Sequence, residues 1–152
     1  MRLRTIALAG LAAAALAACG SNDSEEAPAA CAGPAAEYLR ALRAAPDAVR
    51  LGGETAISDC FTGEESPAVG QAAIRAASLL NAEARRDPAG PATVRLGYLS
   101  GAVHEGTSQV PSEAELVRRL DASARYNPRG GSLGAAFERA FGKGYAAGQT
   151  TG

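Results

Sequence analysis

A strongly helical segment near the middle of the chain decides the fold class. Residues 66–86 read SPAVGQAAIRAASLLNAEARR. Ser66 followed by Pro67 is typical of a helix N-terminus, because a serine oxygen accepts hydrogen bonds from free backbone N–H groups and proline suits the first turn. The apolar residues that follow recur at helical spacing: Val69, Ala73, Ile74, Ala76, Ala77, Leu79 and Leu80. We therefore expect a long amphipathic helix over this segment.

Four further segments carry helix signals on either side of this one. They cover residues 34–45, 91–106, 112–127 and 133–145. Ser112 and Glu115 have the spacing of a capping box, which predicts that the fourth helix opens at Ser112. Gly142 and Gly144 weaken the last helix, and we expect residues 148–152 to fray.

Five helical segments joined by short connections predict a mainly α fold, a small antiparallel helical bundle. Residues 49–57 alternate in polarity around Gly52-Gly53, a pattern that allows a short β-hairpin. Alanine is abundant and large apolar side chains are few, so the helices must pack closely around one modest core. Residues 31–152 are thus expected to form a single helical domain.

The charge balance excludes one class of partner. The chain has 15 basic and 16 acidic side chains, for a net charge of −1, and no tryptophan. Residues 31–152 alone carry 13 of each sign. Proteins that bind DNA or RNA need a clustered cationic excess, so no nucleic-acid partner is expected.

The first residues have the pattern of an export leader. Arg2 and Arg4 precede an uncharged run over residues 6–18, which contains Leu, Ile, Ala and one Gly. This run is shorter than the roughly 20 residues that span a bilayer. Such a segment is typical of a secretory signal peptide rather than of a membrane helix.

The segment Leu16-Ala17-Ala18-Cys19 resembles the lipobox of bacterial lipoproteins. The resemblance implies that the signal peptide, residues 1–18, is removed and that Cys19 carries lipid. Several acyl chains anchor a protein stably, so the membrane would be a partner on the extracytoplasmic side. The alternative is an ordinary leader cleaved after Ala15-Leu16-Ala17 or Ala12-Ala13-Ala14, which leaves Cys19 free or removed.

Residues 19–30 are expected to form a lipidated N-terminus and a disordered tether, because the segment is acidic and has no large apolar side chain.

Once Cys19 is assigned to lipid, Cys31 and Cys60 remain as a pair. Outside the cytoplasm such a pair oxidises, so we expect a disulfide between them. A redox or metal role would call for a C-x-x-C spacing or nearby histidines.

Two places are candidates for chemistry. His104, the only histidine, precedes Glu105 near the end of the third helix, and we interpret it as a surface capping residue rather than a catalytic or metal-binding one. Arg129, Gly130, Gly131 and Ser132 precede the last helix and could receive an anion. A plain turn that caps the helix is the competing interpretation, because the loop lacks the ending of a phosphate loop.

Four pairs of residues that lie close together in the sequence are interpreted as surface or packing features, not as functional sites. They are Glu64 and Glu65, Glu83 and Asp87, Gly97 and Gly101, and Arg118 and Arg119. The acidic pairs are interpreted as solvated surface, or as partners of Arg86. Gly97 and Gly101 would let another helix approach closely, most simply within the same chain. Arg118 and Arg119 are expected to pair with Glu115, and Arg118 with Asp121.

No catalytic residues, metal ligands or cofactors are predicted. The first functional hypothesis is a non-enzymatic lipoprotein that serves as a binding or structural module of the cell envelope, with an envelope protein as partner. The second is a small-ligand or anion-binding module that uses Arg129, Gly130 and Gly131. The third is an envelope hydrolase, which would need His104 or a buried carboxylate pair.

Overall fold

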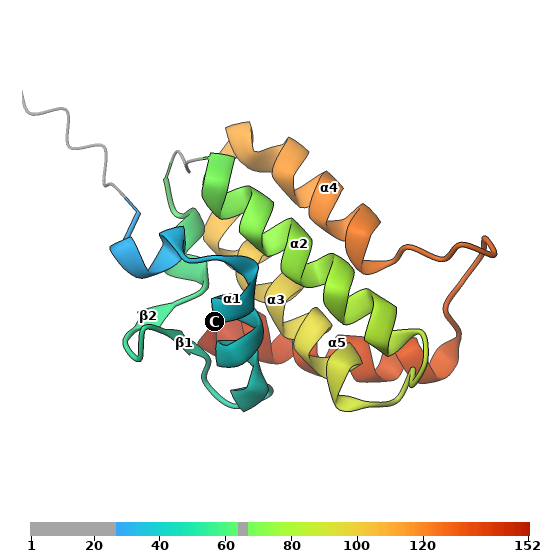
Figure 1. The fold of residues 1–152 in the computed structure, drawn as a ribbon. Coiled ribbons are helices and arrows are strands. Elements are labelled where there is room, and N and C mark those ends of the chain that lie inside the picture. Colours follow the sequence, from blue (N-terminus) through green and yellow to red (C-terminus); the bar gives the residue numbers. More distant parts are fainter. Residues whose placement is uncertain (1–26, 64–66) are drawn as a thin grey trace, which may run out of the picture.

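The computed structural model describes residues 27–63 and 67–152. Cys19, Glu64, Glu65 and Ser66, on which several predictions depend, lie outside the described residues. Figure 1 shows the arrangement of the elements. In chain order they are the 3-10 turn η1 (Ala29–Ala32), α1 (Ala35–Ala41), η2 (Leu42–Ala44), β1 (Arg50–Leu51), β2 (Thr55–Ala56), η3 (Ser58–Phe61), α2 (Pro67–Ala84), α3 (Pro91–Thr107), η4 (Pro111–Glu113), α4 (Ala114–Ala124) and α5 (Ala135–Thr151).

The predicted antiparallel helical bundle is confirmed. Successive long helices alternate in direction, α2 and α4 lie side by side, and α3 packs against α2, α4 and α5 (Figure 1). The segment 66–86 forms a helix from Pro67 to Ala84, and Arg85 still donates its backbone N–H to the Asn81 carbonyl. The helix expected over 34–45 ends instead in the tighter turn η2.

Helix α3 is the centre of the bundle. Its backbone comes closest to that of α5, at positions where both helices have glycine. Gly97 and Gly101 on α3 face the backbone of Phe141 and Tyr145 on α5, so the two helices run in the same direction. From the other side, α5 contributes Gly144 and Gly148, which face the α3 backbone around Val94 and Tyr98. The prediction that the first pair allows a close intramolecular approach is confirmed.

The core lies between α3 and its neighbours. Its largest fully buried side chains include four aromatic residues from separate elements: Tyr38, Phe61, Tyr98 and Phe137. Alanines such as Ala73 and Ala102 fill the remaining contacts with no exposed surface. Within the described residues, no helix combines the length and the apolar character needed to cross a membrane.

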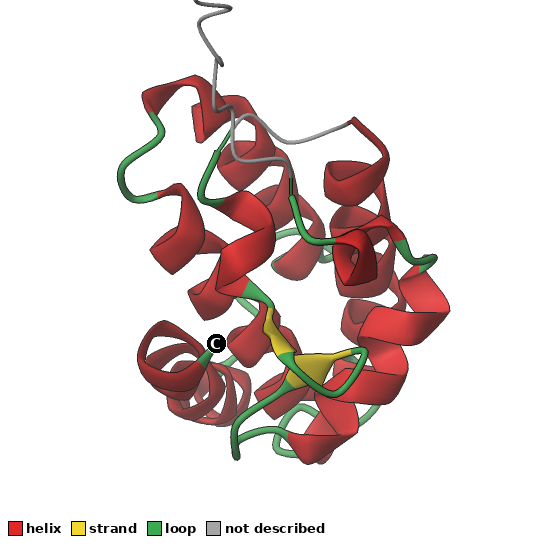
Figure 2. Cartoon of the chain, turned by 90° about the vertical axis from the view of Figure 1, so that its left-hand side faces the viewer, coloured by secondary structure: helices red, strands yellow, loops and turns green. Residues whose placement is uncertain are grey.

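The predicted hairpin and disulfide are both present. Arg50 pairs with Ala56 and Leu51 with Thr55, across a turn in which Gly52 and Gly53 have φ angles of +59° and +91°. These angles belong to the left-handed region that favours glycine. Cys31 on η1 is bonded to Cys60 on η3, with their Cα atoms 5.5 Å apart. Figure 2 shows the two strands beside the C-terminal end of the chain.

Two predictions about helix ends are wrong. The capping box does not form, because Ser112 lies in η4 and Glu113, which caps α4, makes no side-chain cap hydrogen bond. Residues 148–151 do not fray, because they continue α5 to Thr151. Tertiary contacts hold this end: Arg50 donates to the Thr151 carbonyl at 2.9 Å, and Ser58 donates to the Gly152 carbonyl.

Candidate functional site

The loop that sequence reasoning singled out, Arg129 to Ser132, is exposed between α4 and α5. Gly130 and Gly131 have φ angles of +73° and +72°, with no atom within 4 Å of an added Cβ. Glycine is therefore required there by the backbone conformation and not by crowding.

Side chains at both ends of this loop hold its shape. The Asn127 side chain accepts a hydrogen bond from the Arg129 N–H at 3.1 Å and donates one to the Gly130 carbonyl at 2.8 Å. Ser132 Oγ accepts one from the N–H of Gly134, the residue that caps α5, at 3.0 Å. These bonds fit the interpretation as a turn that leads into a helix, since the Arg129 N–H is already engaged.

The fold brings a second arginine to Arg129. Arg85, just past the end of α2, lines a hollow of about 290 Å³ together with Arg129 and Ser132. Asn127, Pro128 and Leu133 complete its walls. Sequence reasoning missed Arg85, because it lies 44 positions before Arg129 and no local spacing links the two.

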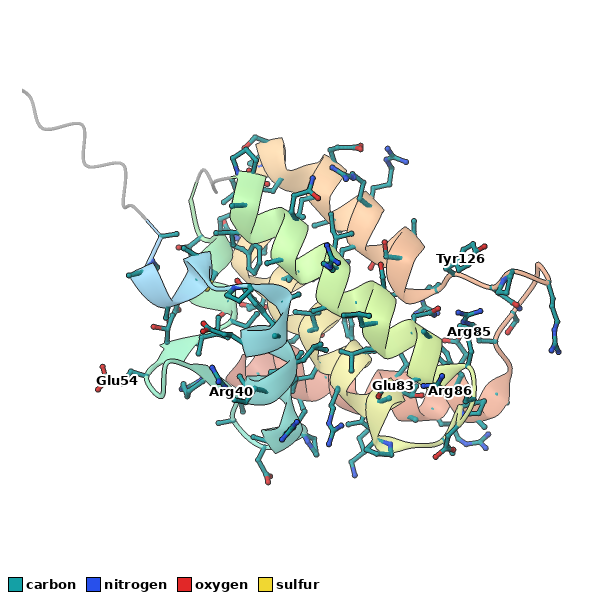
Figure 3. The ribbon with its side chains drawn as sticks, in the orientation of Figure 1. Arg40, Glu54, Glu83, Arg85, Arg86 and Tyr126 are labelled. Atoms are coloured by element: carbon teal, nitrogen blue, oxygen red, sulfur yellow. A yellow bond between two sulfur atoms is a disulfide. The ribbon has the colours of Figure 1, made fainter. Side chains whose placement is uncertain are left out.

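Arg85 also lines an adjoining hollow of about 410 Å³ between α2 and α4. Asn81 contributes to this wall, and its side-chain amide donates to the Ala124 carbonyl at 2.7 Å, which joins the two helices. The Arg85 guanidinium lies over the ring of Tyr126, 5.7 Å from its centre. Figure 3 shows these two side chains close together beside the loop after α4. We call the two hollows together the arginine recess.

The arginine recess has cations but no anions. None of the residues that line either hollow is Asp or Glu. Within residues 27–63 and 67–152, no ion pair includes Arg85 or Arg129. Glu138 on α5 is paired with Arg125 at 2.9 Å.

A third, apolar hollow lies nearer the N-terminal end of α2. It has a volume of about 890 Å³ and runs between α2 and the start of α1, with Leu39, Ala72 and Ile74 among its walls. Leu79 also lines it and is 47% exposed, one of the few large apolar side chains so open to solvent. Ser78 is shared with the arginine recess, so the hollows follow one another along the same helix.

His104 does not act as the predicted surface cap, because its side chain turns toward neighbouring helices. Its Nε2 lies 3.1 Å from Asp121 Oδ1 on α4, and its ring meets the Tyr145 ring on α5 edge-on at 5.4 Å. Burial, followed by the nearby Asp121 charge, raises the pKa of the Tyr145 hydroxyl above 10.0. This cluster joins three helices. Among the described residues no serine, threonine or cysteine side chain hydrogen-bonds to the His104 ring, and Thr107 Oγ1 donates only to the His104 backbone carbonyl, at 3.3 Å.

The remaining predicted pairs behave as surface or packing features. Arg118 forms a two-pronged ion pair with Glu115 at 2.7 to 2.9 Å, as predicted, but Arg119 forms no ion pair with a described residue, and Asp121 pairs with His104 instead. Arg86 forms no ion pair with Glu83 or Asp87 among the described residues, so the solvated interpretation holds for that pair. The described part of the chain contains no cluster of three or more His, Cys, Asp or Glu side chains that could hold a metal ion.

Comparison with known proteins gives no match to this arrangement. No family model, curated protein or solved structure matches the chain. The features of the chain that bear on function are the leader residues and the hollows along α2.

Proposed function

We propose that this chain is a lipid-anchored, extracytoplasmic binding module of the cell envelope, without enzymatic activity of its own. The leader, the lipobox-like Leu16-Ala17-Ala18-Cys19 and the acidic residues that follow support the location. The expected tether is shorter than residues 19–30, because Ala29 and Ala30 belong to η1. The paired cysteines agree with it, because disulfides persist in oxidising compartments.

One observation carries the binding role: successive hollows follow the outward side of α2. The apolar hollow and the arginine recess share Ser78, and the two hollows of the recess share Arg85. Their volumes, about 290 to 890 Å³, are similar in size to small-molecule sites. We call this side of the molecule the α2 face.

The anchor is tested by detergent phase partitioning. We expect the wild-type chain to enter the detergent phase and the Cys19→Ser variant to enter the aqueous phase, because acyl chains on Cys19 supply the apolar surface. Mass spectrometry of the mature N-terminus is the second measurement. An unmodified N-terminus created by cleavage after Ala14 or Ala17 would support the ordinary leader and contradict lipidation.

The α2 face is tested by site-specific photo-crosslinking in intact cells. A photoreactive amino acid at Tyr126, which is 58% exposed, should give discrete crosslinked products. The matched control is the same amino acid at Glu54, which is exposed on the distant hairpin turn (Figure 3). Identical products from both positions, or none from Tyr126, would contradict the proposed binding face.

A further inference from the structure

We infer that the arginine recess binds an oxyanion of the phosphate type, carried either by a soluble ligand or by a lipid headgroup. The inference deepens the proposed function by naming the chemistry of the ligand. It rests on the binding role but not on export or lipidation.

The charges in the recess call for an anionic partner. Arg85 and Arg129 line the same hollow, and neither forms an ion pair with any described residue. Among the exposed arginines elsewhere, Arg40, Arg118 and Arg125 each have a carboxylate partner on the protein. Others have no ion pair with a described residue: Arg43, Arg75, Arg86, Arg119 and Arg139. Arg85 and Arg129 differ from these because they line one hollow together. Because residues 31–152 carry equal numbers of acids and bases, two arginines that share a hollow without an acid form a local excess.

The shape of arginine favours phosphate over a simple point anion. A guanidinium group presents planar N–H donors that match two oxygens of a phosphate or carboxylate at once. Contact with the Tyr126 ring restricts the Arg85 side chain, so less conformational entropy is lost when the anion binds. Ser132 Oγ already accepts from Gly134, and its own hydroxyl proton is available for a third hydrogen bond.

The C-terminal end of α2 offers a competing explanation for Arg85 alone. A cation is favourable next to the last carbonyl groups of a helix, and Arg85 directly follows α2. That effect does not account for Arg129, which belongs to the loop after α4. Arg86 occupies a similar place at the end of α2 but does not line the recess, which makes it a matched control (Figure 3).

The test uses the full-length chain carrying Cys19→Ser, so that a lipid anchor cannot mask the result. Inorganic phosphate and phenyl phosphate are titrated by calorimetry at constant ionic strength. In parallel, the chain is sedimented with vesicles of phosphatidylglycerol and phosphatidylcholine, or of phosphatidylcholine alone. Saturable binding of the soluble probes identifies a free phosphate ligand, whereas binding only to the anionic vesicles identifies a headgroup.

Variants decide whether the recess is responsible. Arg85→Gln with Arg129→Gln should weaken binding at least about tenfold, because two charge-assisted hydrogen-bonding groups are lost. The control, Arg86→Gln with Arg119→Gln, removes the same charge from exposed positions outside the recess and should change affinity less than about twofold. Equal losses in both double variants, or no binding of any probe, would overturn the inference.

A second measurement uses the arginines of the unsubstituted recess, so it remains valid if one of the double variants is destabilised. In NMR spectra, the side-chain Nε–H signals of Arg85 and Arg129 should shift as phosphate is added, while that of Arg86 stays in place. Equal shifts at all three arginines would show that phosphate is attracted non-specifically by exposed positive charges, and would contradict a specific site in the arginine recess. If the titrations succeed but the crosslinking at Tyr126 fails, the recess chemistry stands and the proposed cellular role does not.

Discussion

At the scale of single residues, the disulfide is the contact with the clearest energetic consequence. Cys31 and Cys60 are separated by 29 positions. Closing a loop of that length removes conformational entropy from the unfolded chain, equivalent to about 3.6 kcal/mol. For a domain with so thin a core, this is a large part of a typical free energy of unfolding.

We expect Cys31→Ala with Cys60→Ala to lower the free energy of unfolding by about 3 to 4 kcal/mol. Urea denaturation of the oxidised wild type and the variant measures the difference. Wild type in excess reductant serves as a control and should lose a similar amount. A loss below about 1 kcal/mol would contradict the expected contribution.

Tyr145 gives the chain a predictable response to alkaline pH. Its pKa in the folded chain is raised above 10.0 by burial and by the charge of Asp121. In the unfolded chain the hydroxyl ionises first, so stability falls as pH rises from about 10 through the folded pKa. Below that window the phenol is neutral in both states, and no pH dependence comes from this group.

Tyr145→Phe should therefore reduce the loss of stability between pH 9 and pH 11. The comparison is the free energy of unfolding of the variant and the wild type across that range. A wild-type slope in Tyr145→Phe would contradict this assignment.

His104 illustrates what residue-level sequence reasoning could and could not predict. Its position near the end of the third helix was visible in the sequence and suggested a cap. Its partner Asp121 is 17 positions away on α4, and its ring contact, Tyr145, lies on α5. Only the packing of three helices brings these groups together, so no local spacing could have indicated the pair.

At the scale of elements, the contact between α3 and α5 depends on glycines from both helices. Sequence spacing predicted a close approach from Gly97 and Gly101, and the structure confirms it. The same reasoning treated Gly142 and Gly144 together as weaknesses of the last helix. The structure separates them: Gly142 has nothing within 4 Å of an added Cβ, whereas Gly144 lies against the Val94 backbone.

This difference makes a matched pair of substitutions. Gly142→Ala should raise the free energy of unfolding by about 0.5 to 1 kcal/mol, because alanine is the better helix former and the site is open. Gly144→Ala should lower it by about 1 to 3 kcal/mol, because the added methyl group meets backbone that cannot move aside cheaply.

Thermal and urea unfolding of both variants measure the pair. The intrinsic preference of alanine for helices is the same at both positions, so the difference in sign isolates the interhelical contact. Equal stabilisation by the two substitutions would contradict the packing described for α3 and α5.

At the scale of the whole molecule, the Tyr98 hydroxyl connects segments from three parts of the chain. It accepts a hydrogen bond from the Val49 N–H at 3.0 Å, and it lies 3.0 Å from Thr151 Oγ1. Tyr98 itself is fully buried on α3. This contact helps to explain why the last residues of α5 stay helical although their sequence suggested fraying.

Thr151→Ala should lower the free energy of unfolding by about 1 kcal/mol, because the buried Tyr98 hydroxyl loses a partner. The control is Thr150→Ala, at an exposed neighbour whose hydroxyl bonds only within α5. It should be neutral or slightly stabilising, since alanine favours helix. Urea unfolding compares the two, and equal effects would contradict the role of Thr151.

The sequence by itself determined the helical class and the pairing of Cys31 with Cys60, because periodicity and cysteine number are local or countable properties. It allowed the hairpin through the turn glycines Gly52 and Gly53, and the structure decided that the hairpin forms. It also indicated the export leader and Cys19, which no described residue tests. Tertiary structure alone decided that Arg85 joins Arg129, that Asp121 pairs with His104, and that the end of α5 is held. These outcomes depend on which helix faces pack against one another. The close packing of helices at glycine and alanine positions determines those faces, and it involves segments that are far apart in the sequence.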